Sequence, residues 1–391
     1  MTDFSKMIDR RHSNSVKWDV ADNELPMWVA DMDFQTLPAI VDAIEDRAKN
    51  GIFGYEEVPQ AYFEAVQNWY AEEHNWRPDT EWMIFATGVV PTISSSVRRL
   101  TNVGDNVLVQ APVYNIFYNS IVNNGRHVLS SDLVRDDQDV YHIDWNDLEA
   151  KMAEPLTTMM ILCNPHNPVG HIWSAETLAK IGDLAAKHHV VVLADEIHGD
   201  ITAPGKEYTP FASVNKVNEQ NSVTCVSPSK TFNVAALHAA TVIVPNEALR
   251  SVVDRGLNTD ELAEPNSFAI PGTIAAYTKG HQWVTELRAY VEENKNVVTK
   301  FINDNISSVH VVHGDATYLI WLDISEVGMP AKRLGQLIRE KTGLYLSEGS
   351  VYGGDGDQFL RMNLACPRQR VLDGLNRLET GIKAAKAAIK A

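Results

Sequence analysis

One lysine follows an apolar segment at a place where open α/β sheets carry their chemistry. Lys230 stands in the run Ser-Pro-Ser-Lys-Thr-Phe-Asn, directly after the predicted strand Ser222–Val226. Such sheets bind ligands beyond the carboxyl ends of their strands. A lysine at that point forms an imine with a carbonyl compound if burial or nearby positive charge lowers its pKa. A lone loop lysine is more often a solvated surface residue, so the prediction depends on the residues around it.

A carboxylate and an amide follow two other predicted strands. Asp195 ends the run Val-Val-Val-Leu-Ala-Asp, and His198 comes shortly after it. A carboxylate there is costly to bury unless it meets a cation, and a protonated ring nitrogen is such a partner. Asn167 lies in a rigid turn with two Asn-Pro steps, either of which is compatible with a cis peptide, and its amide can donate to a ring hydroxyl. Taken singly, a helix cap is the better explanation for Asp195 and a simple turn for Asn167.

Four further sites are suited to an anion or a flat ring. Gly88 and Val89 lie between a predicted strand and a predicted helix, where free backbone N–H groups bind phosphate. Ser-OH groups flank Lys230 and can do the same. Tyr114 can stack on a planar ring, although packing is the commoner role of such a residue. Arg361 has the planar guanidinium that grips a carboxylate with two hydrogen bonds, unless it forms only a surface ion pair.

The elements that position these residues alternate between strand and helix. Short apolar runs predict buried strands at Trp82–Ala86, Asn106–Gln110, Met159–Cys163, Val190–Ala194, Ser222–Val226 and Thr241–Val244. A helix is predicted over Ser174–His188, where Ser174 and Thr177 offer capping side chains. Strands buried on both faces and alternating with helices indicate a mainly parallel α/β sheet.

The pattern changes after Gly280. It predicts a long helix over His281–Asn305, strands at Tyr318–Ile324 and Phe359–Leu364, a helix over Ala331–Thr342 between them, and a final helix. We therefore expect a large domain over residues 46–280 and a smaller α+β domain formed by residues 1–45 and 281–391. A cleft between the two domains is the expected place for a ligand.

Composition narrows the class of protein. The 391 residues include 34 Lys and Arg and 51 Asp and Glu, a net charge of −17, which argues against nucleic acid and against an anionic membrane as partners. The three cysteines, Cys163, Cys225 and Cys366, lack metal-ligand spacing, so neither a disulfide framework nor a metal site is expected. The N-terminus has no apolar signal core, and no uncharged apolar run approaches about 20 residues. We expect a cytoplasmic protein.

In this order, the motifs resemble the fold-type I pyridoxal-phosphate enzymes, the aspartate aminotransferase superfamily, along essentially the whole chain. More narrowly, the sequence is similar to the MalY/PatB-type C–S lyases, which are cystathionine β-lyases. The narrower resemblance is carried by RRHSNSVKWD, MWVADMDF, IFGYEEVP, DEIHGD, SKTFNVAAL and LRMNLACPR. It implies an α/β fold with a mainly parallel seven-stranded sheet in the large cofactor-binding domain and a smaller α+β domain.

The resemblance implies pyridoxal 5′-phosphate as the cofactor and assigns roles around its ring. Lys230 resembles the lysine that holds the cofactor as a Schiff base, and Asp195 resembles the partner of its ring nitrogen. Asn167 resembles the donor to its phenolic oxygen, and Tyr114 resembles the residue stacked on the ring. His198, a further cofactor contact, stands where transaminases usually carry tyrosine.

The resemblance also implies a phosphate site, at which this chain departs from the usual pattern. The implied phosphate contacts are the backbone amides of Gly88 and Val89 and the residues Ser227 and Ser229. Many members of the superfamily add an arginine eight residues after the lysine, where this chain has His238. In addition, Ala236 stands where related lyases often have glycine, which we expect to matter only for packing.

The remaining implied roles concern the substrate and a second subunit. Arg361 resembles the clamp for the α-carboxylate of a small amino-acid substrate, and Ala30 lies where the family offers a backbone amide. Tyr55 is similar to the tyrosine that reaches the phosphate of the neighbouring subunit, which implies a homodimer with shared active sites.

Three functions are compatible with these residues. The first is a C–S β-lyase that cleaves L-cystathionine and related cysteine thioethers to a thiol (homocysteine), pyruvate and ammonia, with Lys230 as the catalytic residue. The second is an aminotransferase of the same fold, because both reactions use the same lysine. The third is a catalytically inactive binding module, against which the intact set of Lys230, Asp195 and Arg361 argues.

Overall fold

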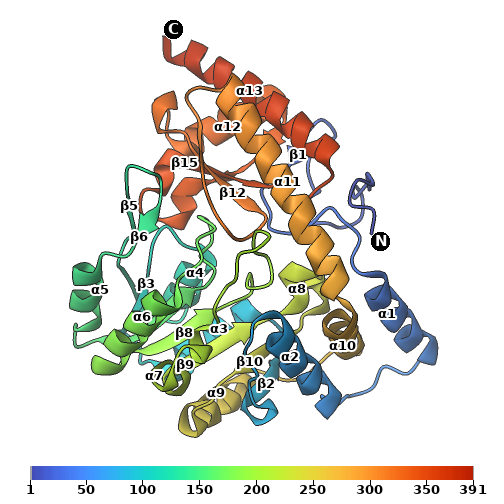
Figure 1. Ribbon diagram of the computed structural model, residues 1–391, viewed down its shortest axis with the longest axis vertical. Coiled ribbons are helices and arrows are strands. Elements are labelled where there is room, and N and C mark those ends of the chain that lie inside the picture. The colour runs from blue at the N-terminus through green and yellow to red at the C-terminus, as the bar shows by residue number, and fades with distance from the viewer. Residues whose placement is uncertain (1, 391) are drawn as a thin grey trace.

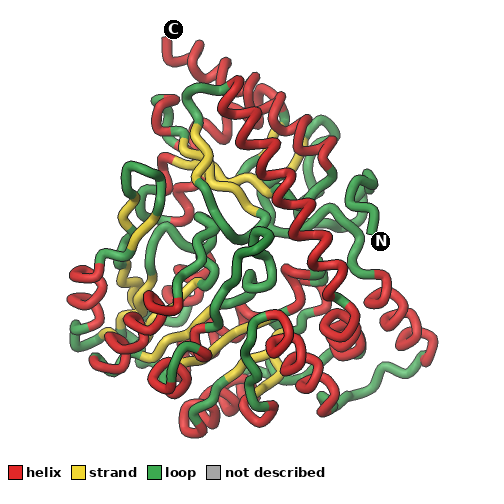
Figure 2. The backbone as a smooth tube through the Cα atoms, viewed as in Figure 1, coloured by secondary structure: helices red, strands yellow, loops and turns green. Residues whose placement is uncertain are grey.

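The computed structural model describes residues 2–390 of the chain. Its strands gather in two groups, with a band of loops between them (Figure 2). The long helix α11 (His281–Asn305) runs beside both groups, from the lower part of the molecule to the upper part in Figure 1. The molecule is therefore built around two sheets, and the loops at their junction are available for a ligand site.

The larger sheet has seven strands in the order β2-β10-β9-β8-β7-β3-β4. These are β2 (Met83–Ala86), β3 (Asn106–Val109), β4 (His127–Ser130), β7 (Thr157–Cys163), β8 (Val191–Asp195), β9 (Ser222–Val226) and β10 (Ala240–Ile243). Six of these strands run in the same direction, and β10 runs in the opposite direction between β2 and β9. The predicted mainly parallel, seven-stranded α/β sheet is confirmed. The edge strand β4 was not predicted, because its residues are only half-buried and form no apolar run.

Helices cover both faces of this sheet. Those that belong to it are α2 (Gln60–Glu73), α3 (Val89–Leu100), α4 (Ile116–Val122), α5 (Trp145–Met152), α6 (Ala175–Lys187), α7 (Lys216–Gln220), α8 (Pro228–Thr231), α9 (Glu247–Thr259) and α10 (Ala269–Lys279). As predicted, Ser174 caps α6, since its Oγ accepts a hydrogen bond from the Thr177 N–H at 3.1 Å. Helices α3 and α9 pack against each other on one face, while α10 packs against α2.

The smaller sheet is antiparallel, in the order β11-β12-β15-β14. Its strands are β11 (His310–Val312), β12 (Leu319–Asp323), β14 (Ser347–Glu348) and β15 (Phe359–Asn363). The helices α12 (Ala331–Thr342) and α13 (Arg368–Lys390) pack against each other and enclose an apolar core with this sheet (Figure 1). Outside both sheets, β1 (Leu25–Pro26) pairs in parallel with β13 (Leu344–Tyr345), and β5 (Val134–Arg135) pairs with β6 (Tyr141–His142).

One of the two expected domain boundaries falls between helices, and the other falls inside a helix. Gly280 separates α10 from α11, at the expected boundary between residues 280 and 281. The boundary between residues 45 and 46 falls inside α1 (Pro38–Asn50), which packs against α10. Residues 1 and 391, which the division also includes, lie outside the described residues. Within residues 2–390, no helix combines the length and the apolar character needed to cross a membrane.

Candidate active site

Lys230 lies in the short helix α8, at the carboxyl end of β9. Ser227 caps this helix by accepting a hydrogen bond from the Ser229 N–H at 3.1 Å. The Lys230 Nζ donates to the carbonyl oxygen of Ala30 at 2.7 Å. Burial lowers the pKa of Lys230 to about 8, and the positive charge of Arg361 contributes to the same shift. A substantial fraction of the amine is therefore neutral near pH 8, as a nucleophile requires.

Asp195 ends β8, beside β9, with Cys163 and Cys225 as its partners in the two neighbouring strands. Burial raises the pKa of Asp195 to about 6, against the effect of a hydrogen bond from the Ile197 N–H at 3.2 Å. The carboxylate forms no ion pair with any residue from 2 to 390, although Lys230 lies near enough to lower its pKa slightly. A cation bound beside it would stabilise the charged form.

A cavity of about 240 Å³ lies between these two side chains, at the carboxyl ends of the strands. Its lining contains the predicted residues Ala30, Gly88, Val89, Tyr114, Asn167, Asp195, His198, Ser227, Ser229 and Lys230. His238 lines it as well. The structure thus brings these sequence-predicted residues together at one site. Of the residues predicted with them, Arg361 lies just behind the lining and Tyr55 lies elsewhere.

Arg361 projects from β15 of the smaller sheet, where it is 5% exposed. Its Nη1 donates to Asn167 Oδ1 at 3.1 Å, and its Nη2 donates to the Trp28 carbonyl at 3.0 Å. The Nε–H is buried and has no acceptor among the described residues. A buried donor without a partner is costly, so a carboxylate at this point would satisfy it.

The contact with Arg361 also settles how Asn167 is oriented. Arginine can only donate hydrogen bonds, so the Asn167 atom that faces it must be the amide oxygen. The amide nitrogen is then left as a donor, in agreement with the role predicted for it. The turn that carries Asn167 contains two cis peptides, Asn164–Pro165 and Asn167–Pro168.

The phosphate end of the cavity is built on the start of α3. Gly88 occupies the position before the helix, and the Val89 backbone opens its first turn. Free N–H groups and the helix dipole make this a suitable anion site. The Ser227 hydroxyl already donates to the Ala239 carbonyl at 2.7 Å, so its proton is not available to a phosphate. Among the two predicted serines, Ser229 is therefore the better donor.

His198 lines the cavity as a neutral imidazole. It is buried, and burial together with the positive charges of Lys230 and Arg361 lowers its pKa to about 3. Its Nδ1 has no hydrogen-bond partner among residues 2–390. Close by, the Tyr318 hydroxyl donates to the Ala30 carbonyl at 2.9 Å, the same oxygen that accepts from Lys230. The Ala30 carbonyl therefore already accepts two hydrogen bonds from the protein, one from Lys230 and one from Tyr318.

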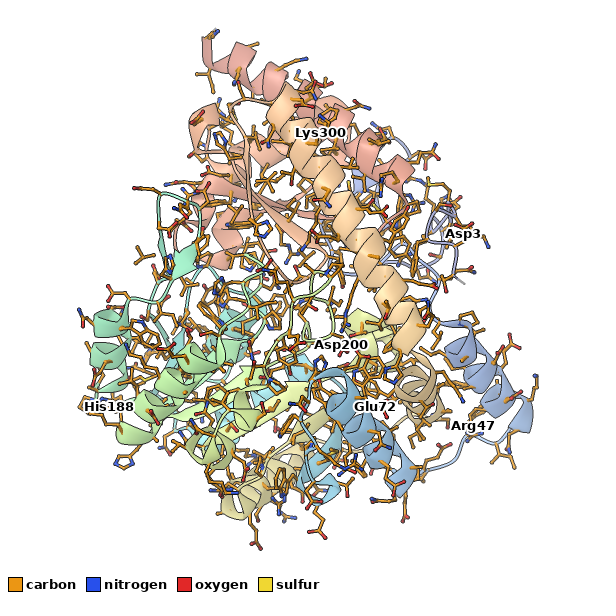
Figure 3. All side chains as sticks on the ribbon, in the orientation of Figure 1. Asp3, Arg47, Glu72, His188, Asp200 and Lys300 are labelled. Atoms are coloured by element: carbon orange, nitrogen blue, oxygen red, sulfur yellow. The ribbon has the colours of Figure 1, made fainter. Side chains whose placement is uncertain are left out.

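A buried hydrogen-bond network around Asp200, which the sequence did not reveal, supports the turn that carries Lys230. Asp200 accepts hydrogen bonds from Thr231 at 2.7 Å and from the Trp69 indole at 2.8 Å, and its carboxylate is 2.7 Å from His74 Nε2. Figure 3 shows Asp200 in the interior, near the middle of the molecule. Thr231 follows Lys230 directly, so the network holds the turn that carries the lysine. Asp200 belongs to the recognised DEIHGD motif, but its partners Trp69 and His74 come from α2 and its C-terminal end and could not be predicted.

A second network holds the segment that contains Ala30. Asp33, 2% exposed, forms ion pairs with Arg10 at 2.8 Å, Lys17 at 3.2 Å and Arg370 at 3.1 Å. Asn363 binds the carbonyl oxygens of Val29 and Asp31, both at 2.6 Å. Asn233, at the end of the SPSKTFN motif, binds the same segment, since its Oδ1 accepts from the Met32 N–H at 2.9 Å. The N-terminal motifs therefore fix the backbone that meets Lys230.

Tyr55 does not reach this cavity. It lies in the loop between α1 and α2 and is fully exposed. No group of three or more His, Cys, Asp or Glu side chains suited to a metal ion occurs within residues 2–390.

The chain is similar to known proteins along nearly its whole length. Residues 24–378 match the family model described as aminotransferase class I and II. The chain is 41% identical over 385 residues to cystathionine beta-lyase PatB of Bacillus subtilis, covering 97% of this chain and 99% of that protein. It is 31% identical over 394 residues to protein MalY of Escherichia coli, covering 99% and 100%. A solved structure of a PLP-bound putative aminotransferase from Clostridium difficile is 36% identical, with a TM-score of 0.95 over 98% of this chain and 100% of that chain.

These likenesses confirm the resemblance to the MalY/PatB-type proteins. They extend over nearly the whole of each relative, so they cover the segments that form both sheets. The chain belongs to the aminotransferase class I and II family.

Proposed function

We propose that this chain is a pyridoxal-phosphate-dependent carbon–sulfur β-lyase, which cleaves L-cystathionine and related cysteine thioethers to a thiol, pyruvate and ammonia. The observation that carries the proposal is that Lys230 and Asp195 line one cavity. Lys230 is an amine with a lowered pKa, and Asp195 is a buried carboxylate without an ion-pair partner among residues 2–390. The relative named cystathionine beta-lyase, 41% identical, supports the choice of reaction.

The residues present fit pyridoxal phosphate. Asp195 would bind the cationic ring nitrogen, Tyr114 would cover the ring, and the free amide nitrogen of Asn167 would donate to the phenolic oxygen. The start of α3 and Ser229 would bind the phosphate, with His238 at the same cavity. When bound, this cofactor supplies an aldehyde that captures amines and a ring that withdraws electrons from the substrate's Cα.

The chain's own residues orient the substrate and move one proton. Arg361 would hold the α-carboxylate through its unpaired Nε–H, assisted by the Ala30 backbone N–H. Lys230, released as a neutral amine, takes the proton from Cα. The electron pair left at Cα forms a double bond to Cβ as the thiolate departs from Cβ, and water then hydrolyses the released enamine to pyruvate and ammonia. His198 stays neutral in this environment and would act only as a contact.

The same lysine and carboxylate would also serve transamination, which returns the proton to the cofactor instead of expelling a thiolate. The solved structure titled a putative aminotransferase keeps that reaction as the alternative to be tested. The higher identity to a protein named as a lyase favours elimination.

A homodimer with shared active sites belongs to this proposal. The loop between α1 and α2 exposes Ile52 at 71%, Phe53 at 58% and Tyr55 at 101%. Exposed apolar side chains gathered on one loop are typical of an interface. A second subunit would cover them and would receive Tyr55 at its own phosphate site. Analytical ultracentrifugation tests the dimer directly, since a monomer at micromolar concentration would contradict it.

The proposal also covers the domain division of the chain and its cellular location. We propose the division into a domain of residues 46–280 and a domain of residues 1–45 and 281–391, supported by the two separate sheets and by Gly280 between α10 and α11. We also propose a cytoplasmic location, supported by the three buried, unpaired cysteines.

One assay separates the two reactions. Purified protein loaded with cofactor is incubated with L-cystathionine in the absence of any keto acid, and pyruvate and free thiol are measured. We expect both products to appear in equal amounts, with Lys230→Ala as the inactive control. Pyruvate that forms only after a keto acid is added would contradict the lyase and support the aminotransferase.

A further inference from the structure

A second cavity, of about 380 Å³, adjoins the site of Lys230 on the side of the smaller sheet. The two cavities have neighbouring walls, because Tyr114 lines the first and the next residue, Asn115, lines the second. Likewise, Ala30 lines the first cavity and Trp28, two residues before it, lines the second. Arg361 lies between them, since its guanidinium binds both Asn167 of the first wall and the Trp28 carbonyl of the second. A substrate whose α-carboxylate is held at Arg361 therefore lies next to this second cavity.

One wall of the second cavity is aromatic and rigid. The rings of Trp28 and Tyr345 are stacked, with centroids 4.8 Å apart and planes at 18°. The Arg339 guanidinium lies 3.8 Å from the Tyr345 ring centre and is held by Glu24 through hydrogen bonds of 2.5 and 2.9 Å. Arg339 and Glu24 thus hold the Trp28–Tyr345 stack in place. Such a wall suits the apolar methylene and sulfur part of a thioether.

The opposite side carries polar groups that the protein leaves unpaired. Lys332 and Gln336 share one face of α12, because they are four residues apart. Lys332 is exposed and Glu348, on β14, is half-buried. Neither side chain forms a hydrogen bond or an ion pair with residues 2–390, and both line the cavity. Gly335 between them leaves the helix backbone open to the cavity. One cation and one anion, both unpaired, therefore line the same cavity.

An unpaired cation and anion in one cavity match a ligand that carries both charges. The free α-amino acid group is such a ligand, with a carboxylate for Lys332 and an ammonium for Glu348. Lys332 also stands in the first turn of α12, where the helix dipole favours an anion. A simple alkyl group would pair with neither charge, and a simple anion would be repelled by the carboxylate of Glu348.

We propose that this cavity is the subsite for the distal amino acid of the thioether substrate, with Lys332 binding its carboxylate and Glu348 its ammonium group. The proposal rests on the proposed function and deepens it, because it selects thioethers of two amino acids over S-alkyl cysteines. In this arrangement the α-carboxylate of the cysteine part lies at Arg361, the thioether lies along the Trp28–Tyr345 stack, and the departing thiol is itself an amino acid.

Two substrates distinguish the subsite from the reaction. The steady-state constants for pyruvate release are measured with L-cystathionine, which has a distal amino acid, and with S-methyl-L-cysteine, which has none. We expect Lys332→Gln and Glu348→Gln each to raise KM for L-cystathionine by roughly five- to tenfold, with kcat nearly unchanged, as the loss of one hydrogen bond at a partly exposed site implies. Neither substitution should change KM for S-methyl-L-cysteine.

Arg333→Gln is the matched control. It removes an exposed positive charge next to Lys332 on the same helix, but Arg333 does not line the cavity. An equal rise in KM for Arg333→Gln would show a general charge effect and overturn the subsite. So would unchanged constants in both variants, or equal changes for the two substrates.

A binding measurement keeps the two proposals separate. Calorimetric titration of cofactor-loaded Lys230→Ala protein with the same two amino acids reports affinity without turnover. Tighter binding of L-cystathionine that weakens in Lys230→Ala/Glu348→Gln supports the subsite even if no pyruvate is ever released. Pyruvate release from both substrates with no preference for L-cystathionine would overturn the subsite and leave the lyase reaction standing.

Discussion

Two lysines of this protein, Lys230 and Lys295, have similar acidities in very different surroundings. Burial lowers the pKa of each to about 8. Each donates to backbone carbonyls, Lys230 to Ala30 at 2.7 Å, and Lys295 to Gly314 at 3.0 Å and Ala316 at 3.2 Å. Their charge states are thus nearly the same, whereas only Lys230 lines the cavity that also contains Asp195.

The difference lies in what else surrounds each amine. Lys230 has a single hydrogen bond, a cavity of about 240 Å³ and a carboxylate beyond it. Lys295 satisfies two carbonyl groups of the segment that leads into β12, and that segment also pairs with Gly170, whose carbonyl accepts from the Ala316 N–H. A lowered pKa therefore indicates burial in both cases, and only the neighbouring cavity turns an amine into a candidate nucleophile.

The largest expected effect separates the two lysines by activity. Lys230→Ala removes the amine that takes the Cα proton, so pyruvate release from L-cystathionine should fall by roughly 10³-fold or more. Lys295→Ala should keep the visible absorption of the bound cofactor and most of the activity. Absorption spectra and the pyruvate assay check both variants. A Lys230→Ala protein that kept the visible band of the wild type would contradict the assignment.

A smaller effect concerns the pH dependence of cofactor capture by the protein freed of cofactor. The amine must be neutral to react, and the pKa of Lys230 is lowered to about 8. The rate at which the visible band develops should therefore rise by about tenfold per pH unit below pH 8 and level off above it. Stopped-flow absorption at several pH values provides the measurement. A rate that continued to rise toward pH 10 would mean that Lys230 keeps the acidity of an exposed lysine.

The smallest expected effect concerns stability and isolates Lys295. In the folded protein the pKa of Lys295 is lowered to about 8, whereas in the unfolded chain it has its ordinary value of 10.5. Between these values the unfolded state binds more protons, so the contribution of Lys295 to stability rises with pH. The free energy of unfolding of cofactor-loaded wild type, minus that of Lys295→Met, should increase by about 1.4 kcal/mol per pH unit from pH 8 to 10.

Urea denaturation at a series of pH values gives this difference. Lys206→Met serves as the control for removing an exposed lysine, which is paired with Asp315 at 3.1 Å. A flat difference for Lys295→Met would show that the folded protein does not lower its pKa.

The same contrast shows which features were predictable. The strands that precede Lys230, Asp195 and Asn167 are short apolar runs with polar residues directly after them, and parallel strands bring those ends to one edge of a sheet. The edge strand β4 escaped prediction because it is only half-buried. Lys295 was not singled out, since it lies inside a long helix where a lysine is ordinary.

Sequence alone determined the order of the motifs, the mainly parallel sheet and the residue types of the site. These are local properties, because the apolar run and the polar residue that follows it are neighbours in the chain. Tertiary structure alone decided the contacts that make them a site. Lys230 meets the carbonyl of Ala30 across 200 residues, and Arg361 meets that of Trp28 across 333.

The second cavity was decided in the same way. It joins Trp28, Asn115, Lys332 and Glu348, which come from separate parts of the chain. The two charged residues, Lys332 and Glu348, follow no regular spacing in the sequence. No local pattern in the sequence marks Lys332 and Glu348 as partners of one ligand. Only the packing of the smaller sheet and α12 against the loop that carries Trp28 places both unpaired charges beside the site of Lys230.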